Sequence, residues 1–103
     1  MADLDFDLTV GRDAGGGWRL TLRGELDLGS APQLERALAE SGADVLLDLR
    51  GLTFMDSTGV RVLLQAAKRQ RRGLRILAPV DGDASVTIAE TGIAPLLPLV
   101  DEP

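Results

Sequence analysis

The tetrapeptide Asp56-Ser57-Thr58-Gly59 carries the side chains with the clearest chemical potential in this chain. It comes after the apolar run Val45–Leu49 and just before apolar residues at helical spacing, so we expect it at the start of a helix. An exposed serine hydroxyl there is a candidate phosphoryl acceptor, because the positive helix end and its free amides tolerate an anion. The phosphoryl group would lie beside Asp56 and bring roughly −1.5 to −2 charges into any interface at this surface.

The same tetrapeptide also has a purely structural interpretation. Aspartate, serine and threonine are the preferred residues at helix N-caps. Ser57 is expected at the N-cap or next to it, where its hydroxyl would only satisfy amides of the first turn. The local sequence leaves both interpretations of Ser57 open.

The residue types that are missing exclude most catalytic chemistry. The chain has no cysteine and no histidine, which excludes disulfides, thiol nucleophiles, imidazole acid–base catalysis and nearly all zinc sites. We therefore expect a protein that is not an enzyme and needs no cofactor or metal. A small enzyme that uses carboxylates is an alternative, and it would need a polar pocket near Asp56. We interpret the other candidate carboxylate, Asp48, as structural.

Size and charge limit the possible partners. The 103 residues are enough for one domain, expected over residues 1–103, and 45% of them are hydrophobic. The net charge of −5 argues against nucleic acid as a partner. No apolar run is long enough to cross a membrane, and the acidic N-terminus does not look like a secretory signal. We expect a cytoplasmic protein without a membrane partner, and a monomer is favoured although the sequence leaves the oligomeric state open.

The elements that must position Ser57 follow from hydrophobic periodicity. Alternating apolar residues predict two strands, Phe6–Val10 and Trp18–Leu22, joined by a glycine-rich turn into a hairpin. Ser30 and Gln33 have the spacing of a capping box for a helix that ends at Gly42. This helix is expected to bury an apolar face and to expose its charged residues: Leu34, Ala37 and Leu38 face the core, and Glu35, Arg36 and Glu40 face solvent.

The second half of the chain repeats this alternation of strand and helix. The run Val45–Leu49 predicts a strand buried on both faces. A helix follows, with Gly73 at its C-cap and Arg71 and Arg72 in its last turn; its predicted apolar face is Val60, Leu63, Leu64 and Ala67. Then come a buried strand, a short helix that ends at Gly92 and an edge strand within Leu96–Val100. This order predicts an α/β domain with a mixed, mostly parallel sheet.

Several of these segments together resemble the STAS domain of bacterial anti-sigma factor antagonists. The resemblance extends from about Phe6 to Val100. It implies a mixed sheet with helices packed mainly on one face and a protein without catalytic activity. The residues that carry it are Gly24-Glu25-Leu26-Asp27, Val45-Leu46-Leu47-Asp48-Leu49, Phe54-Met55-Asp56-Ser57-Thr58-Gly59, Leu63-Leu64 and Gly73-Leu74-Arg75-Ile76-Leu77.

The resemblance also implies a function. The protein would bind an anti-sigma factor that is a serine kinase and thereby free a sigma factor. The kinase, which binds the ATP, would phosphorylate Ser57 and end the binding, and a serine phosphatase would reset it. The implied partner-binding residues are Asp56, Ser57, Thr58 and Gly59 with the neighbouring Asp27, Leu28, Gly29 and Ser30.

Two of these positions remain open in the sequence. Asp27 is equally compatible with a surface residue before a helix that has no partner role. Arg61 stands where relatives often carry a small residue, so it is expected to alter the choice of partner. The alternative function within the same family is a STAS scaffold subunit of a transport or stress-signalling assembly, in which Ser57 is only a helix cap.

Overall fold

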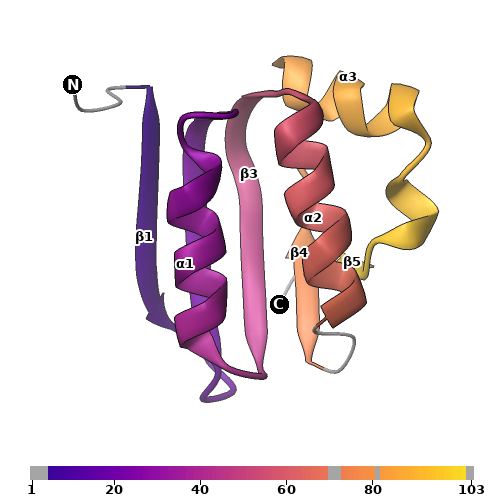
Figure 1. Ribbon diagram of the computed structural model, residues 1–103. Helices are drawn as coiled ribbons and strands as arrows, with labels where there is room; N and C mark the ends of the chain where they lie inside the picture. Colours follow the sequence, from indigo (N-terminus) through magenta and orange to yellow (C-terminus); the bar gives the residue numbers. More distant parts are fainter. Residues whose placement is uncertain (1–4, 70–72, 81, 102–103) are drawn as a thin grey trace.

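The computed structural model describes residues 5–69, 73–80 and 82–101. Its elements alternate between strands and helices along the chain (Figure 1). They are β1 (Phe6–Arg12), β2 (Trp18–Leu26), α1 (Ala31–Ser41), β3 (Val45–Met55), α2 (Ser57–Arg69), β4 (Leu74–Leu77), α3 (Gly82–Thr91), a 3-10 helix (Ala94–Leu96) and β5 (Leu99–Val100).

The strands form one mixed sheet in the order β1-β2-β3-β4-β5. β1 and β2 are antiparallel, and every later pair is parallel. The predicted fold class is therefore confirmed. Because β2, β3 and β4 are parallel, the turns that follow their carboxyl ends emerge at one edge of the sheet.

The core lies between the sheet and two helices. α1 and α2 lie side by side over one face of the sheet (Figure 1), and α3 lies at the end of β3 that leads into α2. The predicted apolar face of α1 is confirmed, since Leu34, Ala37 and Leu38 are all buried, and the helix ends at Gly42. In the part of the chain that the structure describes, no helix has the length and apolarity to span a bilayer.

The buried face of α2 differs from the prediction by a small rotation. Gly59, Val62, Leu63 and Ala66 are buried, whereas the predicted Val60, Leu64 and Ala67 are only partly buried against the core. The predicted last turn of this helix, with Arg71 and Arg72, lies outside the described residues. Gly59, the first buried residue of α2, packs closely against the ends of β2 and β3, as described with the site below.

Both central strands extend further than their hydrophobic patterns predict. β2 continues past Leu22 to Leu26, and β3 continues past Leu49 to Met55. The additional residues pair with each other, and register shifts in β2 interrupt the alternation that sequence reading depends on. Gly24 lies in the left-handed region at φ 92°, where a Cβ atom would collide with the Asp5 carbonyl. The extensions carry the following turns to the edge of the sheet.

The face of the sheet away from α1 and α2 carries an ion-pair cluster around Asp48. This carboxylate is buried, and it accepts hydrogen bonds from Arg19 Nη2 at 2.6 Å and Arg50 Nη2 at 2.9 Å. The hydrogen bonds from Arg50, followed by those from Arg19, lower the pKa of Asp48 to about 2. Asp48 therefore has a structural role.

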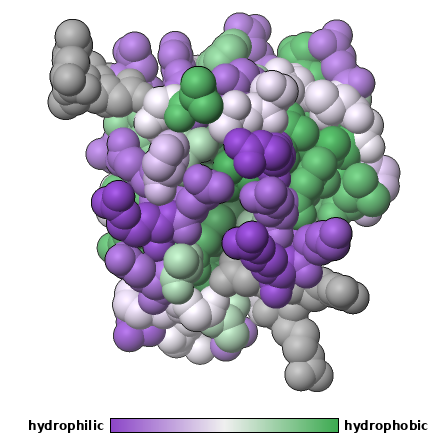
Figure 2. Space-filling model, viewed as in Figure 1, coloured by the Kyte–Doolittle hydropathy of each residue, from purple (hydrophilic) through white to green (hydrophobic). Residues whose placement is uncertain are grey.

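The C-terminal segment is shorter in strand than expected. α3 ends before Gly92, as predicted. The expected strand within Leu96–Val100 is reduced to Leu99–Val100, because the preceding residues form the 3-10 helix and Pro98 has no amide to donate. Figure 2 shows hydrophobic atoms beside α2, over α3 and the 3-10 helix, and exposed residues of these two elements include Val86 and Leu96.

Candidate functional site

The two segments singled out in the sequence lie next to each other at one edge of the sheet. Leu26, the last residue of β2, pairs in register with Met55, the last residue of β3. The Asp56 amide donates a hydrogen bond to the Leu26 carbonyl at 3.2 Å. The turns that begin at Asp27 and Asp56 therefore emerge side by side, and each leads directly into a helix.

Asp56 is the N-cap of α2. Its Oδ1 accepts hydrogen bonds from the amides of Thr58 at 2.9 Å and Gly59 at 3.1 Å. Its carbonyl accepts the Val60 amide at 3.1 Å, the first bond of the helix. Aspartate at an N-cap satisfies the free amides in this way. Ser57 is thus next to the cap, and the capping itself is done by Asp56.

The Ser57 side chain has no structural task among the described residues. Ser57 is the first residue of α2 and is exposed. Its hydroxyl makes no hydrogen bond to any of residues 5–69, 73–80 or 82–101. The hydroxyl is accessible to another protein, and its modification would leave the cap in place.

Asp27 builds the same turn at the start of α1. Its Oδ1 accepts the amides of Gly29 at 3.0 Å and Ser30 at 3.1 Å, and its carbonyl accepts the Ala31 amide at 2.8 Å. Leu28 therefore occupies the position that Ser57 occupies in the other turn, and 72% of its surface is exposed. The adjacent turns present one large apolar side chain and one small hydroxyl.

Ser30 has a different role from the one the sequence suggested. It is fully buried, its Oγ donates to the Glu25 carbonyl at 2.8 Å, and the same Oγ accepts the Asp27 amide at 2.9 Å. Its side chain makes no helix-cap hydrogen bond, so the predicted capping box with Gln33 does not form. Asp27 already holds the first amides, which leaves the Ser30 hydroxyl to tie the turn to β2.

Gly59 is buried beneath the turn. A Cβ atom at this position would lie 2.5 Å from Met55 Cγ and 2.9 Å from the Leu26 carbonyl oxygen. Glycine is required because α2 packs this closely against the ends of β2 and β3, and this close packing also orients the helix. The absence of a side chain at Gly59 therefore allows the start of α2 to pack directly on the ends of the two strands.

Arg61 lies on the exposed side of α2, one turn after Ser57. It forms no ion pair within the described residues. Among the described cations of α2, Arg61 is the closest to Ser57 along the helix.

The structure brings the predicted residues together at one edge of the sheet and separates them by exposure. The exposed ones are Leu28, Gly29, Ser57 and Arg61, the partly exposed ones are Asp27, Asp56 and Thr58, and the buried ones are Ser30 and Gly59.

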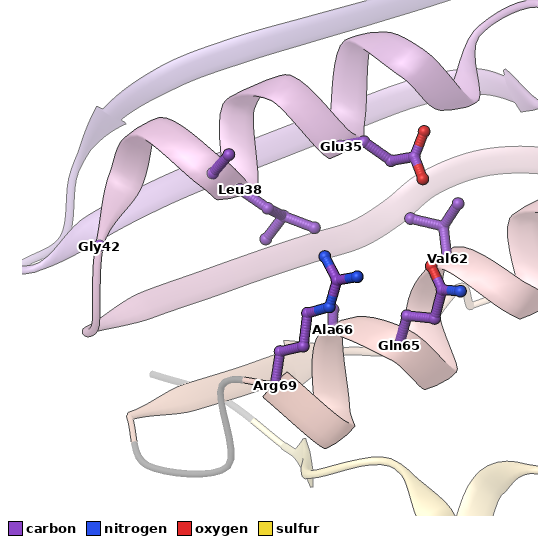
Figure 3. A pocket seen from close by; sticks show the side chains of 8 residues that line it. Glu35, Leu38, Gly42, Val62, Gln65, Ala66 and Arg69 are labelled. Atoms are coloured by element: carbon purple, nitrogen blue, oxygen red, sulfur yellow. The ribbon is translucent and has the colours of Figure 1, made fainter.

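A groove between α1 and α2 was not predicted from the sequence. Its volume is about 270 Å³, and Figure 3 shows Glu35 and Arg69 projecting from the two helices at its rim. It lies along the helices, away from Asp56 and Ser57. It forms where residues of α1 and α2, far apart in the sequence, come together, and no local sequence pattern predicts that pairing. The groove is lined by Glu35, Leu38, Ala39, Gly42, Val62, Gln65, Ala66 and Arg69.

Comparison with known structures supports the fold over the whole chain. The chain aligns with an anti-sigma factor antagonist from Mycobacterium paratuberculosis at a TM-score of 0.78 and 25% identity, covering 99% of this chain and 92% of that one. It also aligns with the anti-sigma factor antagonist SpoIIAA in its unphosphorylated form at a TM-score of 0.66. At 17% identity, over 94% of this chain and 90% of that one, the second likeness shows the fold alone.

Comparison of sequences identifies the family. The anti-sigma-B factor antagonist of Bacillus subtilis (strain 168) is 37% identical over 57 residues. That match spans 52% of this chain and 52% of the relative, about half the length of each. The family model described as "Mlab, STAS domain" matches residues 12–87, which include both helix starts. The chain belongs to the STAS domain family.

Proposed function

We propose that this protein is an anti-sigma factor antagonist that binds a serine-kinase anti-sigma factor in the cytoplasm and so releases a sigma factor. The relatives named above as antagonists support the general role. The paired helix starts support the location of the binding surface. ATP belongs to the kinase, and a serine phosphatase reverses the modification.

The observation that carries the proposal is the free hydroxyl of Ser57. Asp56 holds the amides of Thr58 and Gly59, so the fold does not need a serine at position 57. The exposed hydroxyl is open to a kinase active site. A scaffold subunit in which Ser57 only caps the helix has no such support, because the cap is Asp56.

The unmodified surface is suited to a close contact. Leu28 offers an apolar side chain that a pocket on the partner would bury, and Gly29 and Ser57 add little bulk beside it. Burying an exposed leucine side chain in such a pocket contributes about 1.5–3 kcal/mol of binding free energy. In this proposal Leu28, Gly29, Ser57 and Arg61 contact the anti-sigma factor.

Phosphorylation of Ser57 would end that contact through charge and desolvation. The phosphoryl group adds roughly −1.5 to −2 charges next to the carboxylates of Asp27 and Asp56. The Asp56 carboxylate already occupies two amides of the helix end, so the helix neutralises little of the added charge. Removing this added charge from water in an interface costs several kcal/mol, enough to abolish binding.

The proposal is tested first in the native host. Intact-mass measurement with phosphopeptide mapping, in the presence of phosphatase inhibitors, is expected to find a phosphoryl group on Ser57. Stable co-purification with a large assembly and no phosphorylation under growth and stress conditions would favour the scaffold alternative.

Binding of purified variants to the anti-sigma factor then tests the switch. Ser57→Ala should bind as the unmodified protein does, and Ser57→Asp should bind at least about tenfold more weakly, a change of about 1.4 kcal/mol. Lys68→Asp is the matched control, because it makes the same exposed side of α2 more negative about three turns away. Equal affinities of Ser57→Ala and Ser57→Asp would contradict the switch.

A further inference from the structure

Ser57 and Arg61 are neighbours on the exposed side of α2. They are four residues apart in a continuous helix, and both are exposed. Residues at this spacing have Cβ atoms about 5–6 Å apart. Helical side chains lean toward the N-terminus, so a residue covers the turn that precedes it. The Arg61 side chain is therefore placed to reach over the first turn, where Ser57 lies.

A phosphoryl group on Ser57 would find few other donors at the helix end. The Thr58 and Gly59 amides donate to Asp56 Oδ1, and the Val60 amide donates to the Asp56 carbonyl. The usual stabilisation of an anion by helix amides is thus largely taken by the Asp56 carboxylate. A nearby cation is the remaining source of compensation.

The charged groups around this helix start include several carboxylates and few cations. Along α2, the described cations beyond Arg61 are Lys68 and Arg69, about two turns or more further on. On the neighbouring elements, Arg23 lies in β2 beside Gly51 of β3, and Arg36 lies in the second turn of α1. On the other face of the sheet, Arg19 and Arg50 are paired with Asp48. The carboxylates on the elements that meet at this edge are Asp56 of the same turn, Glu25 and Asp27 at the end of β2, and Asp83 at the start of α3.

We propose that Arg61 is a counterion built into this chain for phosphorylated Ser57. Its guanidinium would donate hydrogen bonds to the phosphoryl oxygens, a pairing that arginine makes with two donors at once. The order is the favourable one, with the anion on the N-terminal side of the cation. This inference rests on the proposed phosphorylation of Ser57 and specifies what the modified surface looks like.

The pairing gives phosphorylation a second effect on the partner. Before modification, Arg61 offers a free cation at the edge of the proposed binding surface. Afterwards, Arg61 is drawn back along α2 onto the phosphoryl group, so the surface gains an anion and loses an available cation. The start of α1 has no equivalent device, since the residue four after Leu28 is Pro32.

The experiment measures the second pKa of the phosphoryl group directly. Phosphoserine is installed at position 57 during translation by codon reassignment, and its ³¹P NMR signal is followed from pH 4 to 8 in the full chain. Three proteins are compared, namely the parent, Arg61→Gln and the control Lys68→Gln. Lys68 is an exposed cation of the same helix that lies too far from Ser57 to pair with it.

A pair with Arg61 favours the doubly charged phosphoryl group and lowers its second pKa. We expect this pKa to be lower by about 0.3 unit or more in the parent and in Lys68→Gln than in Arg61→Gln. The difference should shrink in about 1 M salt, because exposed charges are then screened within a few ångströms. Arg61→Lys should retain part of the shift.

Two results would overturn the inference. One is the same second pKa in the parent and in Arg61→Gln, and the other is an equal rise in both glutamine variants, which would indicate a general field effect. Circular dichroism of each protein checks the fold. Because the phosphoserine is installed without a kinase, the titration stands apart from the proposed switch, which fails instead if Ser57 is unmodified in the host.

Discussion

The starts of α1 and α2 are built alike but present different side chains. In each, an aspartate accepts the amides two and three residues later through Oδ1, and its carbonyl accepts the amide four residues later. The residue after the aspartate is freed from capping in both turns. It is Leu28 in one and Ser57 in the other, so the same backbone exposes a large apolar side chain and a hydroxyl.

The third residue after each aspartate anchors the turn in opposite ways. Ser30 fills its buried position with a hydroxyl that donates to the Glu25 carbonyl. Gly59 has no side chain, which lets α2 approach the Leu26 carbonyl. Adjacent residues of one motif thus divide into buried residues that anchor the turn and exposed residues that are open to solvent.

The largest effect is expected from adding a side chain under the second turn. Gly59→Val should lower the free energy of unfolding by about 3 kcal/mol, because its Cβ would overlap Met55 Cγ and the Leu26 carbonyl. Gly29→Val is the matched control in the first turn, where the nearest atom to a Cβ would be 3.5 Å away, and it should change stability by less than about 0.5 kcal/mol. Urea denaturation measures both, and equal losses would refute the division between anchoring and presenting residues.

A third aspartate, Asp48, forms ion pairs with Arg19 and Arg50, whereas Asp27 and Asp56 accept backbone amides. Its pKa of about 2 in the folded protein lies below the ordinary aspartate value of 3.8. A carboxyl group whose pKa is lowered by folding stabilises the fold at pH values above its pKa in the unfolded chain. This contribution is lost as the pH falls from about 4 to 2. We expect about 2 kcal/mol of acid destabilisation from this group.

The corresponding variant is Asp48→Asn, measured by urea denaturation between pH 7 and pH 2.5. It should be less stable than the parent at pH 7, and the difference should narrow on acidification as the parent loses its ion pairs. A difference that stays constant over this range would show that the ion pairs with Arg19 and Arg50 do not stabilise the fold.

Asp56, the cap of α2, and Asp27, which closes the turn before α1, should contribute smaller and similar amounts. Asp56→Ala and Asp27→Ala are each expected to cost about 1 kcal/mol, because two amides lose their acceptor. Ser57→Ala should cost less than about 0.5 kcal/mol, since its hydroxyl is not used. Thermal unfolding of the three variants distinguishes these roles. If Ser57→Ala lowers the free energy of unfolding as much as Asp56→Ala does, the Ser57 hydroxyl also caps the helix.

The smallest effect on stability is expected at Leu28. Leu28→Ser gives both turns an exposed serine directly after the aspartate. It should leave the free energy of unfolding within about 0.5 kcal/mol of the parent. Binding to the anti-sigma factor should nevertheless weaken about tenfold or more, because the burial of an apolar side chain is lost. Unchanged affinity in calorimetry would remove Leu28 from the proposed interface.

Much of the architecture could be predicted from the sequence because it depends on local patterns. The hairpin follows from alternating apolar residues around glycines, and the core-facing side of α1 follows from Leu34, Ala37 and Leu38. The end of α1 follows from Gly42, whose φ of 77° is readily adopted by glycine. These features depend only on residues that are close together in the sequence, so they can be predicted before the fold is known.

The order of the elements, the parallel arrangement of the central strands and the placement of Asp27 and Asp56 ahead of two helices could all be predicted from the amino-acid sequence, because they depend on local patterns. The folded protein was needed to see that β2 and β3 continue to Leu26 and Met55 and thereby bring those two aspartates side by side. It also decided which member of each turn caps, which is buried and which is exposed. Capping and burial depend on hydrogen-bond geometry and on close packing between segments far apart in the chain, and several residue types in each turn could have taken either role.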